Sequence, residues 1–117
     1  MLKEKNEQML FVRYCDLRGF PCVFIPNGFP IYGIKNKYAY VNSLKAQGYC
    51  KGFPDIMVLA QNSKKDIIFF EFKREKGGRI SREQREWQEK LISLGYDSFI
   101  ANGAKQAIEI LEEWLKK

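Results

Sequence analysis

The order of apolar and polar positions predicts a chain that alternates between helices and strands. Helical spacing of apolar residues, with stop signals behind it, indicates helices over 3–17, 38–46, 81–94 and from Asn102, the expected N-cap, to the end. Short β-branched and aromatic runs predict strands over 22–25, 56–59, 67–72 and 98–101. The first helix is apolar on more than one side, so we expect it to be well buried.

The order of these elements predicts one α/β domain that spans residues 1–117. Two of the predicted strands flank the polar stretch 61–66 and therefore form a β-hairpin. A mixed sheet of about four strands, flanked by helices, accommodates the whole pattern. Residues 29–50 carry the weakest pattern, and their fold is left open apart from the short helix.

One pair of motifs carries candidate chemistry. Gly52-Phe53-Pro54-Asp55 precedes the first hairpin strand, and Glu71-Phe72-Lys73 ends the second. Alternate residues of a strand share a face, so Glu71 and Lys73 lie together and the hairpin brings Asp55 beside them. Two converging carboxylates favour a bound cation, and oxygen ligands favour Mg²⁺ or Mn²⁺. Such a site suits hydrolysis of phosphodiesters; the alternative is a surface Glu–Lys pair and an aspartate in a turn.

Composition excludes several other classes of site. The chain has no histidine, which rules out Ser-His and Cys-His triads, HNH-type nucleases and histidine-ligated zinc. Its three cysteines lack CxxC spacing, so we expect free, buried thiols in a reducing compartment. The charged N-terminus and the lack of a long apolar stretch predict a soluble, cytoplasmic protein that is neither secreted nor membrane-bound.

Motifs before and after Lys73 are informative as a set and in their order along the chain. The chain reads GFPD, EFK, KREKGGR and SREQ, preceded by a helix that starts E-x-x-E-Q and by IPNG at 25–28. In these motifs it resembles the virus-type replication–repair nuclease (VRR-NUC) domains of the PD-(D/E)xK nuclease superfamily, over nearly its whole length. The resemblance implies a restriction-endonuclease-like fold and a Mg²⁺- or Mn²⁺-dependent DNA endonuclease that leaves 5′-phosphate and 3′-hydroxyl ends.

The resemblance also implies roles for individual residues. Asp55 and Glu71 match the metal-binding carboxylates, and the main-chain carbonyl of Phe72 stands where such nucleases often supply a further ligand. Lys73 matches the catalytic lysine, and Gln84 matches the helix glutamine near the site. Gln84 also stands at N3 of a capping box, which is a purely structural alternative.

The acid of the first helix has two candidates. Glu4 and Glu7 both fall in its first turn. Glu4 is the preferred metal ligand and Glu7 is the alternative. Either carboxylate could instead only favour the helix dipole.

A cluster of basic residues follows the E-x-K motif, in a chain whose net charge is +6. The candidates for contacts to DNA phosphates are Arg74, Lys76, Arg79, Arg82 and Arg85. Four lysines of the preceding segment, Lys35, Lys37, Lys45 and Lys51, are further candidates. For the neighbouring tyrosines, Tyr32, Tyr38 and Tyr40, packing or a dimer contact is expected rather than stacking on bases. The alternative for the cluster is a plain solvated turn.

The resemblance narrows the substrate as well. A chain without an accessory domain is similar to the small stand-alone type of phages and bacteria, and in size and plan to archaeal four-way junction resolvases. Two paired cuts need two active sites in fixed relation, which favours a homodimer. We therefore expect a homodimeric nuclease for Holliday junctions without a small-molecule cofactor. The alternatives are a 5′-flap nuclease, a non-catalytic DNA-binding module, and an interaction protein that uses residues 29–40.

Overall fold

A computed structural model of the chain describes residues 3–26 and 32–117. Its helices are α1 (Glu4–Arg18), α2 (Lys37–Ala46), α3 (Arg82–Ser93) and α4 (Ala104–Leu115). Its strands are β1 (Cys22–Phe24), β2 (Ile56–Val58), β3 (Ile68–Lys73) and β4 (Asp97–Asn102). Most predicted boundaries are met within one or two residues. The second half of the IPNG motif, residues 27–28, lies outside the described residues.

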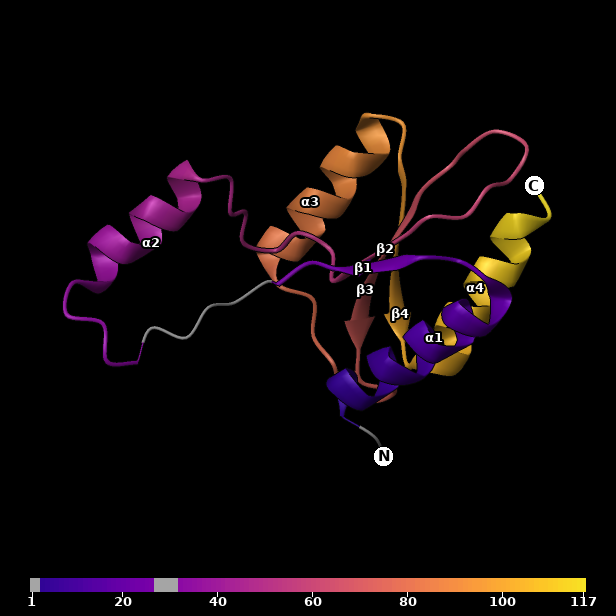
Figure 1. Cartoon of the computed structure of the whole chain (residues 1–117), viewed down its shortest axis with the longest axis horizontal. Coiled ribbons are helices and arrows are strands. Elements are labelled where there is room, and N and C mark those ends of the chain that lie inside the picture. The colour runs from indigo at the N-terminus through magenta and orange to yellow at the C-terminus, as the bar shows by residue number, and fades with distance from the viewer. Residues whose placement is uncertain (1–2, 27–31) are drawn as a thin grey trace.

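The sheet is mixed and has the order β1-β2-β3-β4. β2 runs antiparallel to both β1 and β3, whereas β4 runs parallel to β3. α1 and α4 cover one face of the sheet and α3 covers the other (Figure 1). The predicted α/β class, with a four-stranded mixed sheet flanked by helices, is confirmed.

The core forms where α1 and α4 meet β3. All six residues of β3 are buried, because neighbouring strands and two helix layers enclose it. The Phe11 ring of α1 lies 4.8 Å from the Phe70 ring and 5.3 Å from the Phe72 ring, measured between centroids. Alternate side chains of a strand point to opposite faces, so Phe70 and Phe72 occupy this core while Glu71 and Lys73 face α3.

The prediction that the first helix is buried on several sides is wrong. Its buried residues are Glu7, Phe11 and Cys15, which follow one another at four-residue spacing. A helix that lies on one layer buries a single stripe fully, so its other apolar side chains are either half-buried at the edge of the core, as Val12 and Tyr14 are, or exposed. The exposed ones are Met9, Leu10 and Leu17.

The predicted N-cap of the last helix is also wrong. Asn102 is the last residue of β4, opposite Lys73, and Gly103 takes the cap position at φ 93°. Glycine carries no capping side chain, and the Glu7 carboxylate of α1 accepts the hydrogen bond from the Ala104 backbone N–H instead, at 3.0 Å. A residue 97 positions away therefore caps this helix.

Two remaining expectations concern the cysteines and the membrane. All three cysteines are free thiols, but Cys15 is fully buried while Cys22 and Cys50 are partly exposed. Among the helices of the described residues, none combines the length and the apolar character that crossing a membrane requires.

Candidate nuclease active site

The β2–β3 hairpin brings Asp55 to the end of β3. Ile56 pairs with Phe70 in this antiparallel register, so the preceding residue, Asp55, stands opposite Glu71. The Asp55 Oδ2 atom accepts a hydrogen bond of 2.8 Å from the Phe72 backbone N–H. The N–H and C=O of one strand residue point to the same side, so the Phe72 carbonyl lies on the side of β3 that faces Asp55.

Glu71 and Lys73 form a buried pair beneath α3. Their residues are 4 % and 6 % exposed, and the Lys73 Nζ atom lies 3.8 Å from Glu71 Oε2. The loop after β3 folds back closely, because a Cβ at Gly78 would lie 2.8 Å from the Lys73 Cβ. The ammonium group is therefore held in a nearly dry environment, where it interacts strongly with negative charge.

Gln84 joins the site through its side-chain amide. Its Nε2 atom donates to Glu71 Oε2 at 3.0 Å, while its Oε1 atom accepts from the Ser81 backbone N–H at 2.9 Å. The Ser81 hydroxyl accepts in turn from the Gln84 backbone N–H. The two ends of the amide thus serve the capping box and the Glu71 carboxylate separately, so the cap leaves a role of Gln84 in the site open.

Gly52 fixes the loop before Asp55 against α3, a role that the sequence reasoning missed. It adopts φ +90°, and a Cβ there would lie 2.5 Å from the backbone carbonyl carbon of Glu83. Residues other than glycine would push this loop away from the first turn of α3. The signal was present in the sequence, as the glycine that opens the Gly52-Phe53-Pro54-Asp55 motif.

One oxygen of Glu71 has no partner. Its Oε1 atom is buried and accepts a hydrogen bond from no N–H or hydroxyl group of the residues that the structure describes. Burial, followed by the nearby charge of Asp55, raises the pKa of Glu71 to about 9. Desolvated carboxylates of this kind are costly without a compensating cation. An oxygen-rich site with an unsatisfied carboxylate oxygen therefore fits a hard divalent cation.

The protein supplies few ligands for such a cation. Within residues 3–26 and 32–117, no group of three or more His, Cys, Asp or Glu side chains gathers closely enough to hold a metal ion. Asp55, Glu71 and the Phe72 carbonyl are the candidate ligands at this position. Mg²⁺ commonly binds through one or two carboxylates, with waters and substrate phosphates completing its coordination, so this small set fits the ion.

The two candidate acids of α1 lie in different surroundings. The charge of half-buried Glu4 contributes to the raised pKa of Glu71, which indicates that it lies within electrostatic reach of the site. Glu7 is buried and occupied with the N-terminus of α4. The structure therefore associates Glu4, and not Glu7, with Glu71.

The predicted basic cluster is exposed beside the site. Its members lie in the loop after β3 and on the first turn of α3, and all five side chains are exposed: Arg74, Lys76, Arg79, Arg82 and Arg85. Arg82 forms an exposed ion pair with Glu86 at 3.4 Å. Exposed pairs of this kind are weak and leave the arginine available to a phosphate.

The raised pKa of Glu71 predicts how stability depends on pH when no divalent metal is present. The pKa of Glu71 is 4.5 in the unfolded chain and about 9 in the folded protein. Between these two pH values the folded protein keeps a proton that the unfolded chain has released. This contribution to stability is present below pH 4.5 and is lost as the pH rises through about 9. We expect Glu71→Gln to flatten the pH dependence of the free energy of unfolding, measured by urea denaturation in EDTA. Glu75→Gln, at an exposed acid, is the control; equal slopes for both variants would contradict the assignment.

Comparisons with known proteins identify the family and the fold. The family model of the VRR-NUC domain matches residues 3–105. A solved structure described as a VRR_NUC domain protein is 18 % identical, with a TM-score of 0.72, and the match covers 98 % of this chain and 89 % of that one. A second, described as a VRR_NUC domain, is also 18 % identical, with a TM-score of 0.67 and coverages of 97 % and 99 %. A search of curated proteins finds no match. The chain belongs to the VRR-NUC family, and it is a nuclease-type domain.

Proposed function

We propose that this nuclease domain is a Mg²⁺- or Mn²⁺-dependent endonuclease that hydrolyses phosphodiester bonds in branched DNA. The observation that carries the proposal is the buried Glu71 carboxylate, which has one oxygen without a donor among the described residues and lies beside Asp55 and Lys73. Structural ion pairs are normally completed within the protein. This one is incomplete among the described residues, and the exposed basic cluster that follows Lys73 in the chain could receive a phosphate.

Each side chain then has a distinct task. Asp55, Glu71 and the Phe72 carbonyl would hold the cation, with Glu4 as a further candidate ligand. The bound cation would polarise the scissile phosphate and lower the pKa of the attacking water. Lys73 would orient that water and stabilise the negative charge that develops on the phosphate. Gln84 donates to Glu71 and keeps its carboxylate in a fixed orientation.

We further propose that the substrate is a four-way junction and that the chain acts on it as a homodimer, in the cytoplasm of a bacterium or of a phage-infected cell. One active site cuts one strand, so paired cuts need two sites related by symmetry. A 5′-flap or another branched DNA is the second candidate substrate. A non-catalytic DNA-binding module is the candidate of another class, and intact Asp55, Glu71 and Lys73 argue against it.

A cleavage assay tests this function. Purified protein is incubated with labelled four-way junction, 5′-flap, linear duplex and single strands, in Mg²⁺, Mn²⁺ or EDTA. We expect paired symmetric cuts in the junction, with 5′-phosphate ends and with no cutting in EDTA. Cutting of the flap alone would keep the chemistry and replace the substrate. Binding of DNA without cutting of any substrate would favour the non-catalytic module.

A further inference from the structure

The segment around α2 carries basic residues without any acidic ones. No Asp or Glu occurs between Asp16 and Asp55, although the chain contains 14 acidic residues. The same stretch holds the lysines at 35, 37, 45 and 51. Residues 32–51 are called the basic arm below. Its charge is uncompensated along the sequence, which is unusual for an ordinary solvated surface that mixes both signs.

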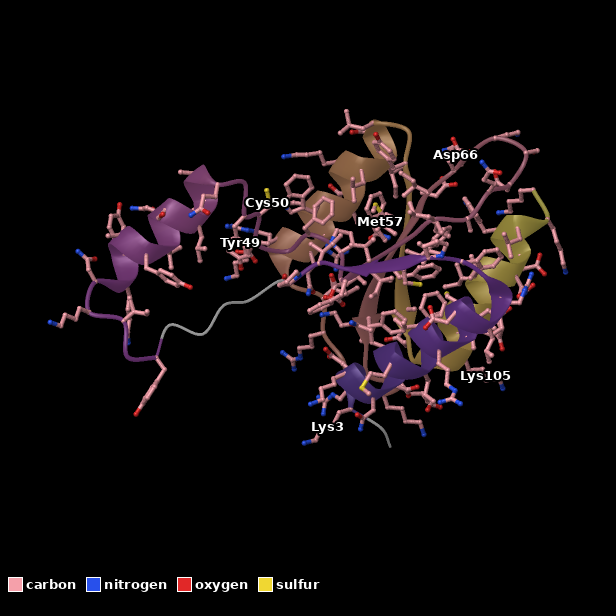
Figure 2. All side chains as sticks on the ribbon, in the orientation of Figure 1. Lys3, Tyr49, Cys50, Met57, Asp66 and Lys105 are labelled. Atoms are coloured by element: carbon pink, nitrogen blue, oxygen red, sulfur yellow. The ribbon has the colours of Figure 1, made fainter. Side chains whose placement is uncertain are left out.

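The basic arm projects from the rest of the molecule. α2 stands to one side of the sheet and of its covering helices (Figure 1), and none of its residues is buried. The chain extends over 49 × 34 × 25 Å with a radius of gyration of 15.2 Å. A compact domain of this length would have a radius of about 13 Å. The arm therefore exposes most of its surface, and Figure 2 shows its side chains spreading outward, with Tyr49 and Cys50 labelled where it joins the body.

Local interactions, rather than packing, define the arm. The Asn36 side chain caps α2 by accepting from the Ala39 backbone N–H at 2.9 Å. Gly48, with a φ of 103°, follows the end of the helix, and the Tyr49 N–H donates a hydrogen bond to the Leu44 carbonyl. An isolated helix of ten residues is marginally stable in water. A partner that binds along α2 would therefore stabilise this helix.

The lysines of the arm are free to bind anions. Lys35, Lys37 and Lys45 are exposed and form no ion pair with any residue that the structure describes. Lys51, at the base, lies 3.9 Å from the Glu83 carboxylate, a weak and exposed contact. Tyr38 is 80 % exposed, so an aromatic ring accompanies the charges.

The base of the arm lies against the first turn of α3, and the same turn contributes Gln84 to the candidate active site. Lys51 and Gly52 lie against Glu83 in the first turn of α3. The next residue of that turn, Gln84, donates to Glu71. A duplex that leaves the site past α3 would therefore meet the arm next, on the same side of the molecule.

We propose that the basic arm is a second DNA-contact surface, which binds the phosphate backbone of a duplex outside the active site. The inference rests on the proposed function for its substrate, branched DNA, whose arms leave the cut point in several directions. A second copy of the chain, packed arm to arm, is disfavoured because it would bring lysines of like charge together with no acidic partner. Tyr32 and Tyr38 are 97 % and 80 % exposed, so the packing expected for them does not occur within the described residues, while the dimer contact stays a prediction.

The test compares two triple variants that each remove three positive charges. The arm variant is Lys35→Ala, Lys37→Ala and Lys45→Ala; the matched control is Lys64→Ala, Lys116→Ala and Lys117→Ala, near the C-terminus (Figure 1). All six lysine side chains are exposed, so both variants should fold, as circular dichroism would verify. Affinity for labelled junction and linear duplex is measured in EDTA over a range of salt concentrations, and cleavage is measured with Mn²⁺.

We expect the arm variant to bind junction DNA at least about 10-fold more weakly and to lower the slope of log Kd against log salt by about 2 to 3. Its cleavage rate at saturating DNA should equal that of the wild type, because the active site is unchanged. The control should change affinity by less than about 3-fold. Equal affinities and slopes for the two variants would overturn the proposal. So would unchanged DNA affinity together with loss of a dimer in light scattering, which would assign the arm to a second copy. If the wild type cuts no DNA, the proposed function fails. The binding measurements in EDTA still test whether the basic arm contacts DNA.

Discussion

Lys73→Ala is expected to lower the single-turnover rate of DNA cleavage by about 100- to 1,000-fold, the usual effect of removing one preorganised group that stabilises developing charge. Lys73 lies 3.8 Å from Glu71 Oε2 in a nearly dry site. Water that fills the space left by the truncated side chain cannot replace a fixed ammonium group there. DNA affinity should change by less than about 3-fold, since Lys73 is 6 % exposed and the exposed arginines make the phosphate contacts.

Arg74→Ala is the matched control, because it removes a positive charge from the next, exposed position. We expect it to weaken DNA binding and reduce the salt dependence, with little change in the rate at saturating DNA. Asp55→Asn and Glu71→Gln should lose cleavage to a similar degree as Lys73→Ala, and Mn²⁺ should stabilise them less against heat than the wild type. Normal cleavage by Lys73→Ala would show that the active site lies elsewhere.

The site could be predicted from sequence to the extent that it depends on local rules. Strand alternation alone puts Glu71 and Lys73 on one face, and the hairpin register puts Asp55 opposite Glu71. The S-R-E-Q pattern likewise identifies the capping box at the start of α3. These features need only the residues within one strand, one hairpin or one helical turn.

Features that depend on contacts between distant segments could not be predicted. Periodicity indicates that α1 has apolar side chains on several sides, but the single layer beneath it decides that Met9 and Leu17 stay exposed. The close approach of Gly52 to α3 requires a positive φ and a neighbour that lies 31 positions further along the chain. The position of α2 away from the body follows from a lack of packing partners, which no pattern within the helix reveals.

Glu7 and Glu4 illustrate the same limit, because one helical turn separates two acids with different expected roles. The Glu7 carboxylate accepts from the Ala104 N–H and lies against Gly103, whose own N–H donates to the Lys73 carbonyl at 3.0 Å. Glu7 thus connects α1 with the ends of β3 and β4 and acts as a positioning residue. The charge of Glu4 instead acts on Glu71.

Removal of the Glu7 carboxyl group should therefore lower stability, whereas neutralisation of Glu4 should lower metal-dependent cleavage. Glu7→Ala leaves the buried Ala104 N–H without a partner, so we expect the free energy of unfolding to fall by about 1–3 kcal/mol. Glu7→Gln retains an acceptor oxygen and should preserve both stability and cleavage. Glu4→Gln should unfold like the wild type but lose cleavage at least about 10-fold and need a higher Mn²⁺ concentration. The measurements are urea denaturation and cleavage rates against Mn²⁺ concentration.

The two glutamine variants, Glu4→Gln and Glu7→Gln, distinguish a metal ligand from a helix cap. Glutamine at either position keeps the size and hydrogen-bonding capacity of the side chain and removes its negative charge. A cap tolerates that change, because an amide oxygen accepts a hydrogen bond as a carboxylate oxygen does. A metal ligand does not tolerate it, because the charge of the carboxylate supplies much of the affinity for a divalent cation. Loss of metal-dependent cleavage in Glu7→Gln, with Glu4→Gln unaffected, would assign the ligand to Glu7 and reverse the roles inferred from the structure.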